Sequence, residues 1–375
     1  MRPVDHGRRR AVQAGLLLPA GLWLAACGDA DDEVAGPATA TNRGFSMPAE
    51  EAPHEATWMC FPTRGDVWAR DLRAVQETIA AIALTIAEFE PVRMLARSED
   101  HRLLRDLVGS DVELLDGPVD DLWARDTLPL FVVNDDGELA AGRVRFNGWG
   151  GKQVHDGDTT LAALVAETLD IELIDSGLVG EGGGLEFDGE GTVLAARSSW
   201  VNDNRNPGLS EATISDALAT TLGAERVLWV DGVAGQDITD GHIDTLARFS
   251  DPSTIVHEFP SYVEPGETWY DLAVDTAEAL SDLRTLDAEP YDLVRLDQPA
   301  TTRRDDAEFL ASYVNYYVCN AAVILPEFGD AAADGTAADV IGELYPGREV
   351  VSLNIDPMSA GGGGIHCATQ QQPAI

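Results

Sequence analysis

Residues 361–367, close to the end of the chain, read Gly361-Gly362-Gly363-Gly364-Ile365-His366-Cys367. Glycine adopts backbone conformations that other residues avoid, and it lets a ligand approach the backbone closely. A cysteine that directly follows four glycines can therefore be exposed and reactive. A flexible tail with a leftover thiol would give the same pattern, so this stretch gains its meaning from the segments that precede it.

A second segment, residues 239–244, reads Thr239-Asp240-Gly241-His242-Ile243-Asp244. His242 and Asp244 are two positions apart, so on a strand both side chains point to the same face. Such a pair supplies a general acid/base and a fixed carboxylate to one pocket. A turn histidine beside a solvated aspartate is the alternative interpretation.

Two further segments carry acidic residues. Residues 121–126 read Asp121-Leu122-Trp123-Ala124-Arg125-Asp126, in which Trp123 offers a flat apolar wall and Asp126 a carboxylate. A guanidinium group is planar and pairs through two parallel hydrogen bonds with a carboxylate. Glu181 lies between glycines, on a backbone tight enough to let it orient a neighbour. A surface ion pair and a solvated loop glutamate are the alternatives.

Apolar runs rich in β-branched and aromatic residues alternate with helical periodicity, which indicates one α/β unit after Phe45. Helices are predicted at Val67–Phe89, Asp158–Leu169, Ser210–Leu222, Thr268–Leu280 and Ala332–Leu344, with Ser210 as a helix start. Strands are predicted at Thr57–Phe61, Val92–Ala96, Val112–Leu115, Leu130–Val133, Arg143–Phe146, Val193–Ala196, Val227–Val230, Thr254–Glu258, Tyr313–Val318, Val323–Pro326 and Glu349–Leu353.

The charge balance is strongly acidic: 65 Asp and Glu against 25 Lys and Arg give a net charge of -40. Such a surface repels nucleic acid and anionic lipid, and it attracts cationic small molecules and arginine-bearing peptides. Because the acids are spread along the whole chain, adaptation to high salt is the main interpretation. No Cys-x-x-Cys or Cys/His zinc spacing occurs, so no metal site is predicted.

The first residues have the composition of a targeting segment. Arg8, Arg9 and Arg10 precede an apolar run, and Leu24-Ala25-Ala26-Cys27 resembles a lipoprotein cleavage box. We therefore expect a lipoprotein-type signal peptide with twin-arginine character over 1–27, lipidation of Cys27, and a flexible linker over 28–44. The protein is then exported and either lipid-anchored to the outer face of the cell membrane or periplasmic. A cytosolic protein with a chance apolar start is the alternative.

Together these segments resemble the agmatine deiminase and bacterial, Porphyromonas-type, peptidyl-arginine deiminase family of the guanidine-modifying (pentein) superfamily. The resemblance covers nearly all of Met47 to Pro373. The blocks that carry it are Met47–Glu50, Pro53–Trp58, Asp121–Thr127, Arg145–Lys152, Glu181–Gly183, Asp188–Thr192, Asn204–Pro207, Thr239–Asp244, Tyr313–Asn315, Pro346–Val350 and His366-Cys367.

The resemblance implies a pentein α/β-propeller, five-bladed and pseudo-symmetric, as a single catalytic domain over 45–375. It also implies a role for each matching residue, and no metal or organic cofactor. Cys367 corresponds to the nucleophile, His242 to the general acid/base, Asp126 and Asp244 to the carboxylates that grip the guanidinium, Glu181 to a supporting acid, and Trp123 to the aromatic wall at the substrate stem.

The implied reaction converts agmatine into N-carbamoylputrescine and ammonia through a covalent thiouronium on Cys367. Agmatine deiminases usually carry an acid at the place of Ile238, so an exported deiminase of arginine or peptidyl-arginine is the first alternative. Leu128 and Arg197-Ser198-Ser199 also depart from the family pattern near the substrate. A guanidine-group transferase and a non-catalytic, lipid-anchored binder of cationic amines remain open.

Three other residues are interpreted from their neighbours alone. Cys60 and Cys319 lie in apolar strand candidates and are expected to be buried packing residues. His366 is expected to lie on a strand and therefore to point away from the face that carries Cys367.

Overall fold

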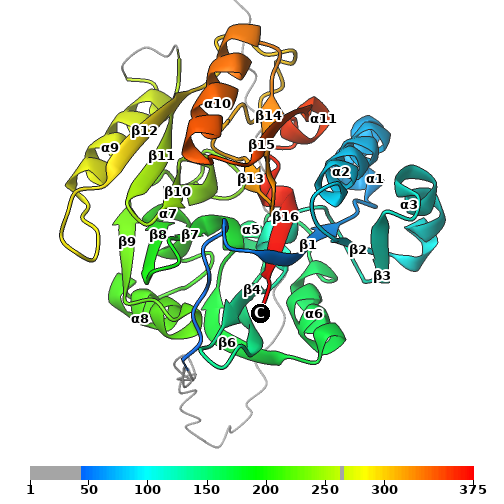
Figure 1. The fold of residues 1–375 in the computed structure, drawn as a ribbon, viewed down its shortest axis with the longest axis horizontal. Coiled ribbons are helices and arrows are strands. Elements are labelled where there is room, and N and C mark those ends of the chain that lie inside the picture. The colour runs from blue at the N-terminus through cyan, green and yellow to red at the C-terminus, as the bar shows by residue number, and fades with distance from the viewer. Residues whose placement is uncertain (1–43, 262–265) are drawn as a thin grey trace, which may run out of the picture. The chain divides into compact units, whose positions relative to one another are not determined.

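Five separate β-sheets are present in the part of the chain that the structure describes (Figure 1). This computed structural model describes residues 44–261 and 266–375. The predicted signal peptide, Cys27 and nearly all of the predicted linker lie outside these ranges. All described residues fall in one compact unit of the chain.

Four of the five sheets share one topology. In each, the first two strands pair antiparallel, the second and third pair parallel, and the segment between these last two contains a helix, as a parallel connection requires. The sheets are β4 (Leu130–Val133), β5 (Leu139–Arg145) and β6 (Glu172–Val179); β7 (Leu185–Phe187), β8 (Thr192–Ala196) and β9 (Arg226–Val230); β10 (Ala247–Asp251), β11 (Thr254–Phe259) and β12 (Asp292–Asp297); and β13 (Tyr317–Val318), β14 (Ala322–Glu327) and β15 (Glu349–Asn354). The connecting helices are α6 (Leu161–Leu169), α8 (Glu211–Leu222), α9 (Thr268–Asp282) and α10 (Ala331–Leu344).

The fifth sheet joins the two ends of the described chain. Strand β16 (Thr369–Pro373) pairs antiparallel with β1 (His54–Cys60), which continues in parallel to β2 (Val92–Ala96) and β3 (Val112–Asp116). Figure 1 shows β16 in red lying against β1 in blue. The helices of this sheet are α2 (Leu72–Ala87) and α3 (His101–Val108). The C-terminal segment is thus part of a sheet rather than a tail, which fixes the backbone that directly follows Cys367.

The structure confirms most predicted elements, corrects two and adds others. Ser210 caps α8, because its hydroxyl accepts a hydrogen bond from the Thr213 amide. The helix predicted over Val67–Phe89 is interrupted: Ala69 has φ of +46°, and α2 starts only at Leu72. The strand predicted over Tyr313–Val318 is reduced to Tyr317–Val318. Strands β6, β7, β10, β12 and β16 and helix α3 were not predicted.

Apolar clusters lie between the sheets and their helices. One of them contains Trp123, Trp149 and Cys367 together with the buried face of α2. Cys60 and Cys319 are buried and unbridged, and Cys367 is also free, which confirms the packing interpretation of the first two. No helix within residues 44–261 and 266–375 combines the length and apolar character of a membrane span.

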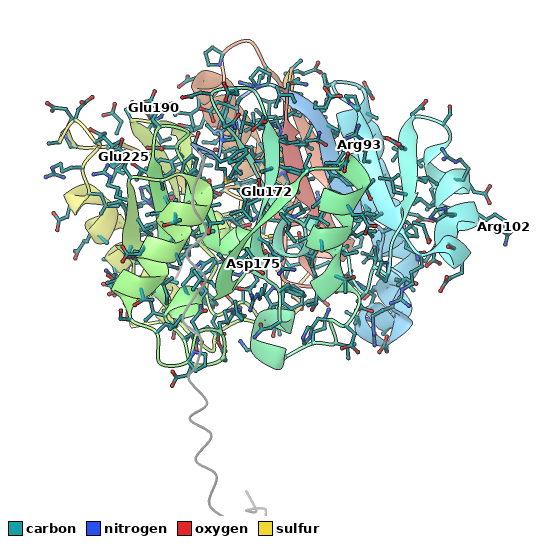
Figure 2. The ribbon with its side chains drawn as sticks, turned by 90° about the horizontal axis from the view of Figure 1, so that it is seen from below. Arg93, Arg102, Glu172, Asp175, Glu190 and Glu225 are labelled. Atoms are coloured by element: carbon teal, nitrogen blue, oxygen red, sulfur yellow. The ribbon has the colours of Figure 1, made fainter. Side chains whose placement is uncertain are left out.

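Charged side chains spread over the surface of the described residues. Figure 2 shows Glu190, Glu225 and Arg102 projecting outward from different elements, and all three are exposed. Asp175 of β6 instead pairs with Arg143 and Arg145 of the neighbouring strand. The surface acids thus come from many separate segments, in keeping with their even distribution along the sequence.

Candidate functional site

Each of the five sheets has one short segment with polar side chains at an equivalent position. The segment comes directly before the strand that forms the sheet's antiparallel pair with its neighbour: β4, β7, β10, β13 or β16. The turn α4 (Ala124–Thr127) precedes β4, and the turn η4 (Gly182–Gly184) precedes β7. The turn η5 (Ile243–Thr245) precedes β10, and the turn η6 (His366–Ala368) precedes β16. In the fourth sheet, the loop before β13 carries Asn315. The repeated topology therefore places Asp126, Glu181, His242, Asp244, Asn315 and Cys367 at equivalent positions.

Three of these side chains surround one small space beside Gly183. A methyl group on Gly183 would lie 2.7 Å from Nδ1 of His242, 2.8 Å from Oδ1 of Asp126 and 3.1 Å from Oδ2 of Asp244. Only glycine leaves this space open. The structure thus brings Asp126 together with His242 and Asp244, which follow it by more than a hundred positions in the sequence. His242 directly precedes the 3-10 turn η5 and Asp244 lies within it, rather than on a strand, but both still face this space.

Cys367 joins the group through Asp244. Its sulfur lies 3.5 Å from Oδ2 of Asp244 and 3.4 Å from Oδ1 of Asn315. The Asn315 amide in turn donates to the backbone carbonyl of Asp244 over 3.1 Å. Cys367 is 8% exposed and Asp244 is fully buried. The asparagine therefore holds the thiol and the carboxylate at a fixed separation.

The glycines before Cys367 act mainly by allowing close approach. A side chain at Gly364 would collide with Asn315, and one at Gly363 would collide with the ring of Trp123. Of the four glycines, Gly362 has a positive φ, of +85°. Unusual backbone angles thus account for only one of these glycines. The absence of a Cβ matters more, because it allows the backbone to lie against Asn315 and Trp123.

His242 lies between two carboxylates. Its Nδ1 is 3.7 Å from Oδ1 of Asp126, and its Nε2 is 3.4 Å from Oε2 of Glu181. Burial favours the neutral imidazole, but the charges of Asp126 and Glu181 outweigh it and raise the pKa of His242 to about 9. Glu181 is held by the buried Arg205, whose Nε lies 2.9 and 2.8 Å from its two carboxylate oxygens. Glu181 is thus held in a fixed place beside the imidazole of His242.

The two aspartates have opposite electrostatic surroundings. Asp126 accepts hydrogen bonds from the Trp149 indole at 2.9 Å and the Gly183 amide at 3.0 Å. Burial nevertheless raises the pKa of Asp126 to about 6, against the lowering effect of His242. Burial also acts to raise the pKa of Asp244, but the hydrogen bond and charge of His366 outweigh it and hold the value below its usual range. Asp244 is therefore the more firmly ionised of the two.

The thiol of Cys367 is held in its neutral form. Burial and the charges of Asp244 and Asp126 raise the pKa of Cys367 well above its usual value. The hydrogen bond from the thiol to Asp244 fits this protonation state. A cation bound between the two aspartates would cancel their charge, and it would thereby favour the thiolate.

His366 lies inside this group of side chains, which corrects the sequence-based expectation. It belongs to a 3-10 turn and not to a strand, so the alternation of faces does not apply. Its Nδ1 lies 2.8 Å from Oδ2 of Asp244, the same oxygen that faces Cys367. Its Nε2 lies 2.9 Å from Oε2 of Glu50. The side chains of His366 and Cys367 therefore converge on one carboxylate.

Apolar side chains border the polar group. Trp123 is 6% exposed and packs beside Trp68, with ring centroids 6.0 Å apart. Ile238 is partly buried and packs against the apolar cluster that contains Trp123 and Cys367. Lys152 covers this segment from outside, because its Nζ lies 2.9 Å from the Ile238 carbonyl and 2.8 Å from Oδ2 of Asp240.

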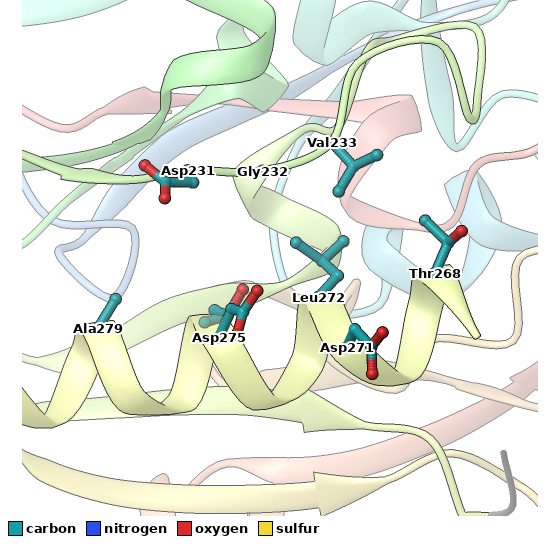
Figure 3. A pocket seen from close by; sticks show the side chains of 9 residues that line it. Asp231, Gly232, Val233, Thr268, Asp271, Leu272, Asp275 and Ala279 are labelled. Carbon is teal, nitrogen blue, oxygen red and sulfur yellow. The ribbon is translucent and has the colours of Figure 1, made fainter. Parts of the chain in front are cut away.

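A separate pocket of about 280 Å³ lies between α9 and the loop after β9. Figure 3 shows Asp231 and Val233 on the loop side, and Leu272 and Asp275 on the helix side. It contains none of the predicted site residues, and Asp231 is already paired with Arg197 at 2.7 Å. Within the described ranges, no group of three or more His, Cys, Asp or Glu side chains is arranged to hold a metal ion.

The sequence interpretation missed several residues that touch the site. Asn315 stands in a quoted block but was given no role, although a single amide among apolar residues was a usable signal. Glu50 and Arg205 also stand in quoted blocks, but nothing within those blocks indicates their partners, which lie in other segments of the chain. The missed contacts are those of Glu50, Trp149, Arg205, Arg248, Asn315 and His366.

The chain matches known proteins over most of its length. Residues 46–373 match the family model described as Porphyromonas-type peptidyl-arginine deiminase. Agmatine deiminase of Stutzerimonas stutzeri is 35% identical over 88% of this chain and 96% of its own length. Agmatine deiminase of Medicago truncatula is 33% identical over 90% and 98%.

The solved structure of agmatine deiminase of Enterococcus faecalis superimposes with a TM-score of 0.83 at 28% identity, covering 91% of this chain and all of that one. The α/β fold is thus that of the pentein-type agmatine deiminases. The match of the family model extends over most of the chain and confirms the resemblance found in the sequence. The chain belongs to the Porphyromonas-type peptidyl-arginine deiminase family.

Proposed function

We propose that this protein is an agmatine deiminase-type hydrolase, which converts agmatine and water into N-carbamoylputrescine and ammonia. The observation that carries the proposal is the convergence of a thiol, an imidazole and two carboxylates around the space beside Gly183. The relatives named agmatine deiminase, which match almost the whole chain, support the substrate. The reaction needs no group beyond these side chains and water.

In the first half-reaction, Asp126 and Asp244 hold the planar guanidinium in one orientation. This orientation lowers the entropic part of the activation barrier. The positive charge of the guanidinium offsets the two carboxylates, so the Cys367 thiol releases its proton to water and the thiolate attacks the central carbon. A C–S bond forms and a C–N bond breaks. The imidazolium of His242, favoured by its raised pKa, gives its proton to the departing ammonia.

In the second half-reaction, water attacks the same carbon of the S-alkyl thiouronium. Neutral His242 accepts a proton from that water, the C–O bond forms and the C–S bond breaks. The thiolate of Cys367 is regenerated and the ureido product leaves. Glu181, held by Arg205, keeps the imidazole in line through both steps.

The basic side chains around the site favour agmatine over free arginine. Each is already paired with a carboxylate: Arg125 and Arg248 with Glu50, Arg205 with Glu181, and Lys152 with Asp240. No basic side chain that contacts the site, among the described residues, is left to bind the α-carboxylate of free arginine. A buried carboxylate without a partner is costly, so we expect free arginine to be a poor substrate.

A peptidyl-arginine substrate is the second candidate, and Ile238 is the observation that favours it. Its apolar side chain packs against the cluster that contains Trp123 and Cys367, and it offers no charge to a distal amine. A peptide-bound arginine has neither that amine nor a nearby free carboxylate. The family name, which refers to peptidyl-arginine, supports the same candidate.

Ammonia release from agmatine, free arginine and arginine-containing peptides tests the proposal. We expect the highest kcat/KM with agmatine and little turnover of free arginine. A preference for the peptide would select the second candidate. Binding of agmatine without ammonia release would instead identify a non-catalytic binder of cationic amines, and it would contradict the hydrolase.

We further propose that the five sheets are the blades of a pseudo-five-fold α/β-propeller. Their shared topology and the equivalent places of the site-bearing segments support this arrangement. The blades then surround the site, and the pairing of β16 with β1 completes the first of them.

Export as a lipoprotein is proposed from the sequence, with 1–27 as the signal peptide, Cys27 as the lipidated residue, 28–44 as the linker and 45–375 as the catalytic domain. The membrane is then contacted only through the lipid. The acidic composition supports activity at high salt, since screening weakens repulsion among surface carboxylates. Metabolic labelling with a fatty acid tests the anchor, and loss of the label in Cys27→Ala is expected.

A further inference from the structure

Asp244 is held by a side chain that the proposed reaction does not use. Of the two oxygens of Asp244, Oδ2 is shared by His366 at 2.8 Å and the Cys367 sulfur at 3.5 Å. Oδ1 is buried and has no hydrogen-bond partner. A buried carboxylate oxygen without a partner is costly, so Asp244 is poised to accept a donor from a bound molecule.

His366 connects Asp244 to a rigid buried network. Its other nitrogen faces Glu50 at 2.9 Å. Glu50 is itself clamped by Arg125 and Arg248, each at 3.0 Å, and Arg248 binds Glu186 at 2.9 Å. His366 therefore joins the carboxylate of Asp244 to that of Glu50 through its two ring nitrogens.

We propose that His366 is a positioning residue for the guanidinium site: it fixes the carboxylate of Asp244 against Cys367 and keeps it ionised, so that Asp244 can hold the cation. This inference rests on the proposed function, because it gives Asp244 a guanidinium to bind. His366 touches neither the sulfur nor the reacting carbon, and it acts through Asp244. The charged or titratable groups that face the His366–Asp244 pair are Glu50, Glu186, Asp126, Arg125, Arg248, His242 and Cys367.

Two substitutions separate the contacts of His366. The amide nitrogen of asparagine is placed like Nδ1, so His366→Asn keeps a donor toward Asp244 and loses the contact with Glu50. The amide nitrogen of glutamine is placed like Nε2, so His366→Gln keeps the donor toward Glu50 and abandons Asp244. Loss of a charge-assisted hydrogen bond corresponds to about 10- to 100-fold. We expect KM for agmatine to rise by about this factor in His366→Gln, less in His366→Asn, and kcat to change less than KM in both.

The pH dependence of kcat/KM distinguishes a positioning role from a structural one, because a loss of packing alone would not shift its acid limb. In the unmodified protein, we expect Asp126 to set the acid limb of kcat/KM, because burial raises its pKa to about 6. Without the imidazole, the pKa of Asp244 rises, so a second carboxylate becomes protonated on the acid side. We expect the acid limb to steepen and to shift to higher pH in His366→Gln.

His54→Asn is the matched control. His54 is also a buried histidine between two oxygen atoms, Oε1 of Glu90 at 3.0 Å and the Glu50 carbonyl at 2.7 Å, but it has no contact with Asp244. We expect this variant to lose stability and to keep the acid limb of the unmodified protein. Equilibrium binding of agmatine in a Cys367→Ser background, measured by calorimetry, gives the same ranking without turnover.

The outcomes are distinguishable. If the unmodified protein turns over agmatine and the His366 variants behave like His54→Asn, the positioning role is wrong and the proposed function stands. A KM effect of His366→Asn that persists unchanged in an Asp244→Asn background would also refute it, because coupled residues are non-additive. Loss of folding in both His366 variants would make the imidazole a structural group. No turnover of any guanidine by the unmodified protein would overturn both proposals.

Discussion

The sulfur of Cys367 lies 3.5 Å from the carboxylate of Asp244, so the proposed nucleophile rests beside a negative charge. Burial, followed by the charges of Asp244 and Asp126, raises the pKa of its thiol well above the usual value. Removing one of these charges therefore lowers the pKa and increases the thiolate fraction at a given pH. We therefore expect the thiol to be unreactive in the free protein and a bound cation to activate it.

Asp244→Asn is accordingly expected to make Cys367 more reactive while it impairs catalysis. Alkylation by iodoacetamide follows the thiolate fraction. A decrease of one pKa unit would accelerate alkylation about 10-fold at about pH 8, and the same substitution should abolish most of the turnover. Mass analysis of the labelled peptide identifies the residue, with Cys367→Ser as the blank. Slower alkylation in Asp244→Asn would contradict the origin of the raised pKa.

Cys367→Ser is expected to abolish ammonia release, by at least about 1000-fold in kcat, because a hydroxyl is a far weaker nucleophile than a thiolate. The fold and agmatine binding should remain, since the sulfur is one small atom beside Asn315 and Asp244. Calorimetric binding and single-turnover ammonia release measure the two properties separately. Cys319→Ser is a control. Cys319 is also a buried free cysteine, but its thiol donates to the Ala322 carbonyl and not to a residue of the site. Full activity in Cys367→Ser would refute the nucleophile assignment.

Glu181→Gln is expected to move the alkaline limb of kcat to lower pH. The carboxylates of Asp126 and Glu181 raise the pKa of His242 to about 9 against the effect of burial, so the imidazolium persists to that pH. With Glu181 neutral, the proton is lost earlier as the pH rises, and ammonia departure loses its acid. Because the folded-state pKa exceeds the unfolded value of about 6.5, the stabilisation from charged His242 is also lost as pH rises through about 9.

The pH dependence of kcat and an NMR titration of His242 measure this shift. Glu90→Gln is the control, because Glu90 is likewise a buried carboxylate near a histidine, His54, but lies outside the contacts of His242. Both variants should lose stability by about 1–3 kcal/mol, measured by urea unfolding. An alkaline limb that stays in place in Glu181→Gln would show that Glu181 does not act on His242.

Gly183→Ala is expected to eliminate activity with a smaller effect on folding. Its methyl group would occupy the space between Nδ1 of His242, Oδ1 of Asp126 and Oδ2 of Asp244. We expect kcat/KM to fall more than about 100-fold, and a stability cost of about 1–3 kcal/mol for overpacking. In Gly335→Ala, the control in α10, the methyl meets no atom within 4 Å. That variant should gain about 1 kcal/mol and keep full activity. A Gly183→Ala variant with unchanged kcat/KM would contradict the location of the site.

The sequence allowed prediction of the site members better than of their geometry. Local signals were strong for both residues of the reaction. His242 follows Gly241 and precedes Asp244 by two positions, and Cys367 comes shortly after four glycines. Their secondary structure was wrong, because the 3-10 turns before β10 and β16 are only three residues long and leave no periodicity to detect. The side of the chain to which His366 points depends on that turn, and so it was predicted incorrectly.

The missing strands have a related explanation. Strand β16 reads Thr-Gln-Gln-Gln-Pro and is buried on every residue, yet its composition is polar and gives no strand signal. It is a strand because β1 offers an unpaired edge. The contact between Glu50 and His366 spans 316 residues, and only the pairing of the two chain ends creates it. Long-range pairing of this kind overrides local propensity, which a single sequence does not reveal.

Ile238→Glu is expected to sharpen the preference for agmatine. Ile238 packs against the apolar cluster that contains Trp123 and Cys367, so a carboxylate at this position would lie beside the stem of a bound substrate. A new ion pair with the distal amine, worth about 1.4 kcal/mol, would raise kcat/KM for agmatine about 10-fold relative to that for propylguanidine. Ile238→Gln has nearly the same shape without the charge and should leave the ratio unchanged. Ammonia release measured with both substrates gives the ratio. If Ile238→Glu instead lowers turnover of both substrates equally, position 238 lies away from the distal end, and the apolar side chain does not determine substrate choice.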